Sequence, residues 1–148
     1  DLSEKELEDL KLAAILHDIG KIGVRDDVLL KQTGLDADEV RKMNQHTEFG
    51  AEILRHVSWL RDIVPGVRGH HERYDGSGYP DKLKGDDIPL IARIIAVADT
   101  FDAMTADRPY RKGLRPETAF EELRKQAWKQ FDGKAVELFI NACEGKEA

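Results

Sequence analysis

The stretch Leu90-Ile91-Ala92-Arg93-Ile94-Ile95-Ala96-Val97-Ala98-Asp99 decides the fold class, because it is almost continuously apolar and contains no glycine or proline. With the residues that follow, it predicts a long helix over residues 90–106. Asp99 shares one face of this helix with Ala92 and Ile95, and an unpaired carboxylate in such apolar surroundings is very unfavourable. Asp99 is therefore predicted to be paired or, more specifically, to bind a metal ion.

Helical periodicity extends over most of the chain on both sides of this stretch. Before it, helices are predicted over residues 3–18, with a Ser3–Glu6 capping box, over 36–57, with an interruption near His46, and over 60–71, with a kink or restart at Pro65-Gly66. After it, helices are predicted over residues 116–129 and 133–143. The apolar stripes predicted for the first two helices are Leu7, Leu10, Ala14 and Ile15, and Met43, Gly50, Ile53 and Val57. No strand pattern, internal repeat or low-complexity tract is convincing, so the predicted fold is all-α.

One long irregular stretch, residues 74–89, interrupts the helical pattern. It contains the turn signals Asp75-Gly76, Ser77-Gly78 and Pro80. Loops longer than about 12 residues inside a compact domain are usually functional or disordered. The segment is therefore a candidate functional loop, with disorder as the alternative.

The composition narrows the class of protein. Of 148 residues, 41% are hydrophobic and 35% charged, as is typical of one ordered globular domain. The net charge of −6 argues against a nucleic-acid polymer as partner, which requires a basic face, but not against a small anionic ligand. No apolar run reaches the ~18 residues of a membrane span. Cys143 is the only cysteine, which excludes an internal disulfide and favours a reducing, cytoplasmic setting; we expect it to be inert.

The pair His17-Asp18 stands at the end of the first predicted helix. His17 follows Ala14 and Leu10 by three and seven residues, so its ring falls on the predicted apolar stripe. A carboxylate that points inward beside this ring needs a partner or a metal ion. The alternative is a hydrogen-bonded core histidine next to a helix-terminal aspartate.

His46 and the pair His70-His71 enlarge this candidate site. His46 continues the stripe of the second helix, and His70-His71 ends the third helix just before the irregular loop. Adjacent helical residues diverge by about 100°, so His70 and His71 reach one site only where two metals lie there or the backbone turns. The alternatives are a structural histidine at position 46 and exposed helix-terminal residues at 70 and 71. His56 lies off the stripe and is expected on the surface.

Four histidines and two aspartates thus form a candidate metal centre, namely His17, Asp18, His46, His70, His71 and Asp99. Nitrogen and oxygen ligands without thiolate suit manganese, iron or zinc, and carboxylate bridges favour a two-metal arrangement. Asp102, one turn after Asp99, is predicted to orient a ligating histidine by accepting a hydrogen bond from its second ring nitrogen.

In these motifs the sequence resembles the HD-GYP family, a branch of the HD phosphohydrolase superfamily. The matching residues are His17-Asp18-x-x-Lys21, His46, His70-His71-Glu72, Asp75-Gly76-Ser77-Gly78-Tyr79-Pro80, Asp99-x-x-Asp102, Arg108-Pro109-Tyr110-Arg111 and Phe131-Asp132. They cover almost the whole chain. His-Asp alone is weak evidence, whereas His-His-Glu followed by Asp-Gly-Ser-Gly-Tyr-Pro is highly specific. The resemblance implies an HD-domain helical bundle with a long Gly-Tyr-Pro loop between helices.

The resemblance also implies a reaction. HD-GYP proteins hydrolyse cyclic di-GMP to the linear dinucleotide and, in some members, to GMP. The metal ligands would be the six residues of the candidate centre, with Asp18 as the bridging carboxylate. Two or three divalent ions would be held there, iron or manganese in the first place and zinc or nickel as alternatives. A metal-bridging hydroxide would attack phosphorus.

Further roles follow from the matched positions. Lys21 would contact the scissile phosphate and act with Asp18 in catalysis. Arg108 and Arg111 would hold the substrate's phosphates, with solvated surface cations as the alternative. Tyr79 would offer a face to guanine, with a rigid turn as the alternative. Glu72, like Asp102, would support the ligands from the second layer of residues.

The implied partners are cyclic di-GMP, diguanylate cyclase domains that bind the Gly-Tyr-Pro loop, a tethered sensor or receiver domain and a second copy in a homodimer. The setting would be the bacterial cytoplasm. Residues 1–148 would form one HD-GYP domain without the family's first helix, whose histidine also binds metal. Arg25 stands where the family commonly has proline.

Two other functions remain open from the sequence. One is an HD-type phosphohydrolase that acts on another nucleotide. The other is a catalytically degenerate module that binds cyclic di-GMP or a diguanylate cyclase. The intact Gly-Tyr-Pro loop weighs against the first function, and the complete set of six ligands weighs against the second.

Overall fold

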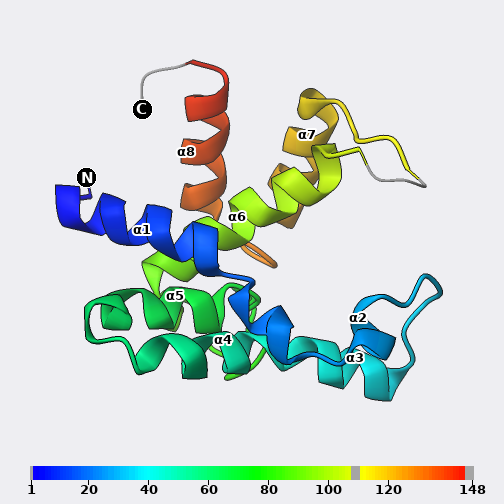
Figure 1. Cartoon of the computed structure of the whole chain (residues 1–148). Coiled ribbons are helices and arrows are strands. Elements are labelled where there is room, and N and C mark those ends of the chain that lie inside the picture. Colours follow the sequence, from blue (N-terminus) through cyan, green and yellow to red (C-terminus); the bar gives the residue numbers. More distant parts are fainter. Residues whose placement is uncertain (1, 108–110, 146–148) are drawn as a thin grey trace.

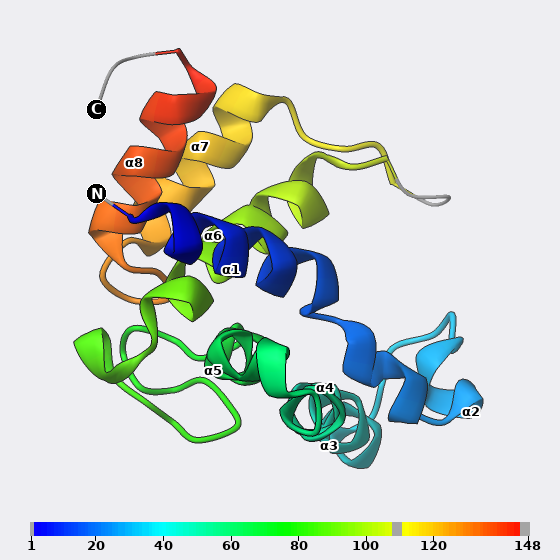
Figure 2. The same cartoon turned by 60° about the vertical axis from the view of Figure 1, so that its left-hand side comes forward.

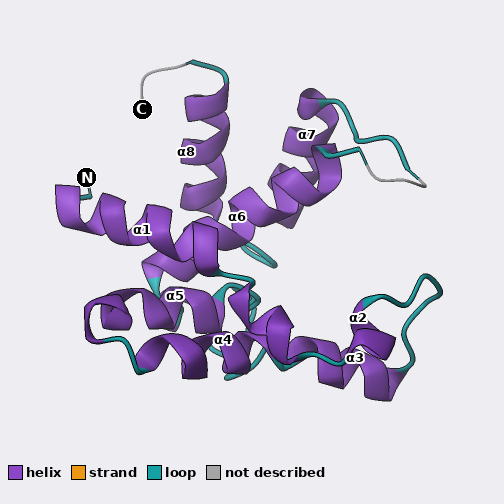
Figure 3. Cartoon of the chain, in the orientation of Figure 1, coloured by secondary structure: helices purple, strands orange, loops and turns teal. Residues whose placement is uncertain are grey.

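The structure is a computed structural model that describes residues 2–107 and 111–145. It is helical, and these residues form no β-strand (Figures 1 and 3). The α-helices are α1 (Glu4–Leu16), α2 (Asp26–Leu29), α3 (Ala37–Asn44), α4 (His46–Arg55), α5 (Val64–Gly69), α6 (Leu90–Thr105), α7 (Pro116–Gln126) and α8 (Gly133–Cys143). The 3-10 turns are η1 (Ile19–Gly23), η2 (Ser58–Ile63) and η3 (Gly85–Asp87). The all-α prediction is confirmed.

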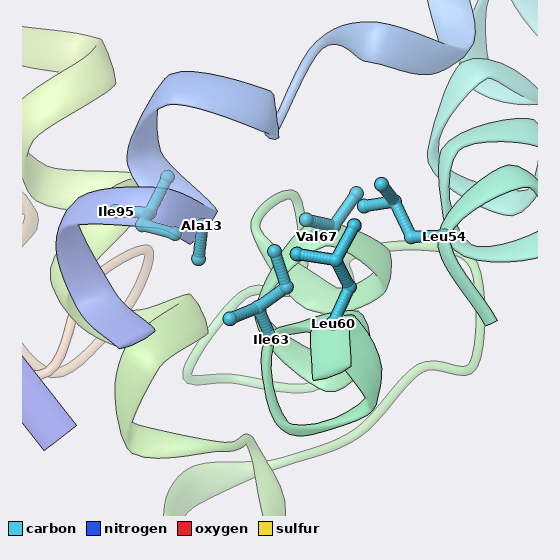
Figure 4. Close-up of a cluster of buried hydrophobic side chains, with 6 residues drawn as sticks. All are labelled: Ala13, Leu54, Leu60, Ile63, Val67 and Ile95. Carbon is cyan, nitrogen blue, oxygen red and sulfur yellow. The ribbon is translucent and has the colours of Figure 1, made fainter. Parts of the chain in front are cut away.

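Helix α6 lies between two hydrophobic cores, which explains why its sequence is apolar on nearly all sides. On one side, α1, α4, α5 and η2 form a core that includes Ile95 of α6; on the other, α7 and α8 pack around Val97 of α6. Figure 2 shows α7 and α8 on one side of α6, and α4 and α5 on the other. The side chains of the first core point toward one another in Figure 4 and are Ala13, Leu54, Leu60, Ile63, Val67 and Ile95.

Several helix boundaries agree with the sequence signals. The Ser3 hydroxyl accepts from the N–H of Glu6, and the Glu6 carboxylate accepts from the N–H of Ser3, so the capping box is confirmed. The predicted interruption near His46 falls at Gln45, between α3 and α4. Pro65 lies in the first turn of α5, where the chain restarts after η2.

Other predictions of detail were wrong. Ile15 is 77% exposed and Ala14 is also exposed, whereas Ala13 is fully buried. In α4 the core position is Leu54, and Ile53 is 42% exposed. Several apolar residues of each helix compete for the buried face, and the packing of the neighbouring helices decides which face is buried.

The segment after α1 and the end of α7 also differ from the prediction. η1 and α2 were not predicted, because each is short and lacks a periodic pattern. α7 ends at Gln126 instead of residue 129, since Trp128 adopts φ +65° in a tight turn that leads into α8. No helix in the described part of the chain is both long and apolar enough to cross a bilayer.

Candidate metal centre

Four histidine rings from three helices meet next to α6. His17 follows α1, His46 begins α4, and His70 and His71 follow α5. The ring centroids of His70 lie 5.1 Å from His17, 5.4 Å from His46 and 4.2 Å from His71. The Nε2 atoms of His46 and His70 are 3.4 Å apart. The structure therefore brings together the four histidines that the sequence analysis selected.

Asp18 lies between two parts of this cluster. Its Oδ2 atom is 3.4 Å from Nε2 of His17, and its Oδ1 atom is 3.4 Å from Nε2 of His46. Asp99 of α6 adds a second carboxylate, whose Oδ1 atom lies 3.6 Å from Nε2 of His17. All six predicted ligands are thus gathered at one place, with the two oxygens of Asp18 directed to different histidines.

The orientation of three rings is fixed by the backbone. Each Nδ1 atom lies 2.7 Å from the carbonyl oxygen of the residue three positions earlier; the pairs are His17 with Ala14, His46 with Met43 and His70 with Val67. Because a carbonyl oxygen can only accept, each Nδ1 carries the hydrogen and Nε2 is the atom that faces the cluster.

The role predicted for Asp102 is filled differently in the structure. The side chain of Asp102 is exposed. The hydrogen bond from the second ring nitrogen, Nδ1, is accepted by a backbone carbonyl in three of the histidines. An acidic neighbour is visible in the sequence, whereas the hydrogen bond that each of these three histidines makes from Nδ1 to the preceding helical turn is not.

The arrangement of donor atoms fits divalent metal ions. The Nε2 atom of His17 is buried and has no hydrogen-bond partner within the described residues, although two carboxylates lie beside it. Two groups of three residues each place their donor atoms within 4.8 Å of one another. One group is His46, His70 and His71, and the other is His17, Asp18 and His70. Nitrogen and oxygen donors at such spacing suit first-row metals such as manganese, iron and zinc.

Charge and burial prepare most of these groups for metal binding. Burial lowers the pKa of His70 to about 3 and that of His71 to about 4, so both are neutral ligands at physiological pH. The nearby carboxylates of Asp18 and Asp99 raise the pKa of His17 to about 10. Its ring in turn lowers the pKa of Asp99. In the metal-free protein, His17 is therefore protonated and positively charged at physiological pH.

A glycine contact holds Asp18 beside His46. A Cβ atom on Gly20 would lie 1.9 Å from the carbonyl oxygen of His46 and 2.3 Å from the backbone nitrogen of Gly50. Only glycine allows η1 to approach α4 this closely. The approach places the residues between α1 and η1, including Asp18, next to the first turn of α4.

The loop after α5 packs against His71 and the residues that follow it. A Cβ atom on Gly78 would lie 2.3 Å from the backbone nitrogen of Arg73, so the loop packs directly on the chain that follows His71. The N–H of Tyr79 donates to the carbonyl of His71 at 3.2 Å, and the two rings stack with centroids 5.0 Å apart. Tyr79 is half-buried and covers one face of a predicted ligand.

Glu72 fixes the far end of the same loop. Its carboxylate, only 4% exposed, accepts from the backbone N–H of Asp81 at 2.6 Å and of Leu83 at 3.1 Å. It therefore orders the loop that covers the histidines, and it contacts the loop backbone instead of a ligand ring.

The other predicted site residues have different surroundings. Lys21 donates to Oδ2 of Asp18, at the edge of the cluster. Arg111 is exposed and donates to the carbonyl of Ala103, one turn beyond Asp99. Arg108 lies outside the described residues. His56 is exposed beside Glu52, as expected. Arg25 is exposed and pairs with Asp27.

A pocket of about 340 Å³ opens beside His70, His71 and Asp99. Its walls include Tyr79 and also residues that the sequence analysis did not select, Arg73, Ser77, Thr100 and Gln130. Arg73 and Ser77 belong to the segment around the Gly-Tyr-Pro motif and could have been found there. Gln130 carries no sequence signal, because only the turn after α7 brings it to the pocket.

Comparison with known proteins identifies the family of this chain. The family model described as HD domain matches residues 1–135. The chain is 44% identical over 141 residues to the 3'3'-cGAMP-specific phosphodiesterase 2 of Vibrio cholerae and 46% identical over 142 residues to a cyclic di-GMP phosphodiesterase response regulator of Xanthomonas campestris. It is 43% identical over 141 residues to a cyclic di-GMP phosphodiesterase of Thermotoga maritima.

Each of these alignments covers 94% of this chain, which spans 27%, 37% and 38% of the three relatives' own length. The crystal structure of a cyclic GMP-AMP specific phosphodiesterase of V. cholerae has a TM-score of 0.75, over 97% of this chain and 40% of that chain. At 24% identity this likeness supports the fold alone.

Proposed function

Because this chain belongs to the HD domain family, and to its HD-GYP type, we propose that it is a metal-dependent phosphodiesterase that opens cyclic di-GMP to the linear dinucleotide. GMP would be a further product where the second diester is also cleaved. The observation that carries this proposal is the position of Asp18, whose two oxygens lie 3.4 Å from Nε2 of His17 and of His46. A carboxylate placed in this way can bridge two metal ions.

The six donor residues would divide into two groups around Asp18. His46, His70 and His71 would hold one ion, and His17 with Asp99 would hold the other. Two such ions lower the pKa of a water molecule and neutralise the charge that develops on a phosphodiester. Iron and manganese are the metals we propose, with zinc or nickel as the alternatives.

The surrounding residues would position the substrate. Lys21, held by Asp18, would place an ammonium group near the scissile phosphate and balance its charge. Arg108 and Arg111 would bind the second phosphate of the cyclic dinucleotide from the segment after α6. Tyr79 covers His71 with one face, so its remaining face would be the one offered to a guanine base.

We also propose for this chain the setting that is typical of the family. Residues 1–148 would be the HD-GYP domain of a cytoplasmic bacterial protein in which a sensor or receiver domain controls hydrolysis. The segment around Pro80 would contact diguanylate cyclase domains, and two copies would form a homodimer.

The proposal is tested by turnover of purified protein under anaerobic conditions with iron or manganese. The substrates are cyclic di-GMP and 3'3'-cGAMP, since the relatives named above carry both specificities. Linear dinucleotide should appear from cyclic di-GMP, and a chelator should stop its formation. If only 3'3'-cGAMP is hydrolysed, the proposed substrate is wrong and 3'3'-cGAMP replaces it. If neither dinucleotide is hydrolysed with any metal, the proposal is overturned.

A further inference from the structure

The pocket beside the metal ligands has walls to which the proposed mechanism gives no role. It lies between α6, the loop after α5 and the turn after α7, with His71 and Asp99 on one side. Arg73, Thr100 and Gln130 complete the lining. Its volume of about 340 Å³ falls in the range of ~300–1,000 Å³ that small-molecule sites occupy. A group attached to a phosphate at the metal centre would reach this pocket directly.

Gln130 brings a free amide to the pocket. Among the described residues its side chain has no hydrogen-bond partner, although the residue is half-buried. Its backbone is fully engaged: the N–H donates to the carbonyl of Gln126 at 3.0 Å, and the carbonyl accepts from the N–H of Tyr74 at 3.1 Å. A half-buried amide offers two donors and one acceptor, and it gains most from a ligand that presents both kinds of group.

The turn that carries Gln130 is rigid. Trp128 adopts φ +65°, a conformation that is unfavourable for a residue with a side chain and persists only where its surroundings hold it. Its N–H donates to the carbonyl of Phe131 at 2.8 Å, and the N–H of Asp75 donates to the carbonyl of Lys129 at 2.8 Å. The loop after α5 and this turn thus form one platform for the pocket wall.

Arg73 is braced on the opposite part of that platform. Its Nε atom donates to the hydroxyl of Ser77 at 2.9 Å, and its Nη2 atom lies 3.5 Å from Oδ2 of Asp75. The hydroxyl of Ser77 in turn donates to Oδ1 of Asp75 at 2.6 Å. Within the part of the chain that the structure describes, the remaining guanidinium donors are free to serve a ligand, and a fixed guanidinium plane matches the O6 and N7 acceptors of guanine.

We propose that this pocket is a guanine subsite in which Gln130 and Arg73 read the edge of one base, while the metal ligands hold the adjoining phosphate. The proposal rests on the proposed function, because it places a base of the cyclic dinucleotide. A phosphate group presents only acceptors and would leave the amide carbonyl of Gln130 unused. Guanine presents acceptors at O6 and N7 and donors at its ring N–H and amino group, so it satisfies both side chains.

The test compares two substrates in one variant. Gln130→Met keeps the length of the side chain and removes its hydrogen bonds. With the manganese-loaded protein, kcat/KM is measured for cyclic di-GMP and for bis(4-nitrophenyl) phosphate, a diester without a purine. The loss for cyclic di-GMP should exceed the loss for the small diester by about tenfold. Gln32→Met, the same change at an exposed amide in the segment between α2 and α3, should leave the ratio of the two substrates at its wild-type value.

A second variant tests the subsite independently, in case Gln130→Met fails to fold. The carboxylate that Gln130→Glu introduces can only accept; guanine offers donors at N1 and N2, whereas adenine offers its N6 amino group. The ratio of cyclic di-GMP turnover to turnover of the small diester should therefore be higher in Gln130→Glu than in Gln130→Met. Equal losses for all substrates in both variants would overturn the subsite.

Failure of the proposed function gives a different result. In that case the wild type opens no cyclic dinucleotide, whatever it does with the small diester. The subsite is then judged from the affinity of the metal-free protein for cyclic di-GMP. A Kd that rises about tenfold in Gln130→Met supports the subsite, and an unchanged Kd overturns it.

Discussion

The Oδ1 atom of Asp18 lies 3.4 Å from Nε2 of His46, although the two residues belong to separate elements. The other oxygen of Asp18 faces His17. One carboxylate therefore connects the group of donors that follows α1 with the group supplied by α4 and the residues after α5. Loss of this residue should affect both groups at once.

Asp18→Asn should remove the carboxylate that would bridge the two proposed ions, while it keeps the shape of the side chain. An amide has one neutral oxygen and one N–H₂ group, which cannot bind a cation. Turnover of cyclic di-GMP should fall by about 10³-fold. Metal analysis should show that more than one ion per chain is lost or bound more weakly. The matched control is Asp62→Asn, an exposed partner of Lys5, which should keep both metal content and turnover.

Gly20→Ala tests the contact that positions Asp18. The new methyl group would meet the carbonyl of His46 and the backbone of Gly50, and backbone cannot move aside as a flexible side chain can. The free energy of unfolding should fall by about 2 kcal/mol, which thermal denaturation would record as a decrease in Tm of about 5 °C. Metal content should decline at the same time.

The matched control is Gly34→Ala, where an added Cβ would have no neighbour within 4 Å. Its Tm should stay close to that of the wild type, within about 0.5 kcal/mol of stability. Equal behaviour of the two variants would show that the approach of η1 to α4 does not set the stability of the centre.

The sequence predicted those features that depend on one helix and its composition. The apolar run before Asp99 predicts α6 because this helix lies between two cores, with Ile95 in one and Val97 in the other. The same run makes a carboxylate at position 99 conspicuous, and the structure places it 3.6 Å from His17. Features of this kind require no knowledge of the neighbouring elements.

Other features depend on packing contacts between elements and were not predicted. Ile53 and Leu54 are equally apolar, and only the packing of α4 against its neighbours makes Leu54 the buried one. In the sequence, Gln130 cannot be distinguished from a surface glutamine. It reaches the pocket only because the chain makes a left-handed turn at Trp128. Without that turn, no pattern of spacing links Gln130 to Asp99.

Glu72→Gln should loosen the loop after His71. The carboxylate accepts from the N–H groups of Asp81 and Leu83, and an amide would turn its own N–H₂ toward one of these donors. Hydrogen exchange at these two amides should accelerate by about tenfold, which corresponds to the loss of one such bond. Glu117→Gln, an exposed change at the start of α7, is the control. Unchanged exchange at both amides would contradict the assignment of Glu72 as the anchor.

Metal affinity should depend on pH through one proton. The carboxylates of Asp18 and Asp99 raise the pKa of His17 to about 10, so the metal-free protein carries a proton there throughout the range from about pH 6 to 8. An ion that binds Nε2 must displace this proton. Its affinity should therefore rise by about tenfold for each pH unit between about pH 6 and 8, since deprotonation becomes easier as pH rises.

His70 and His71 should add nothing to this slope. Burial lowers their pKa values to about 3 and 4, so both are already neutral well below pH 6. Calorimetric titration with Mn²⁺ in buffers of different ionisation enthalpy should detect the release of one proton per chain. His17→Gln should abolish that release while His46, His70 and His71 still bind one ion. A proton release that stays unchanged in His17→Gln would show that the displaced proton does not come from this ring, and would contradict the electrostatic account of the centre.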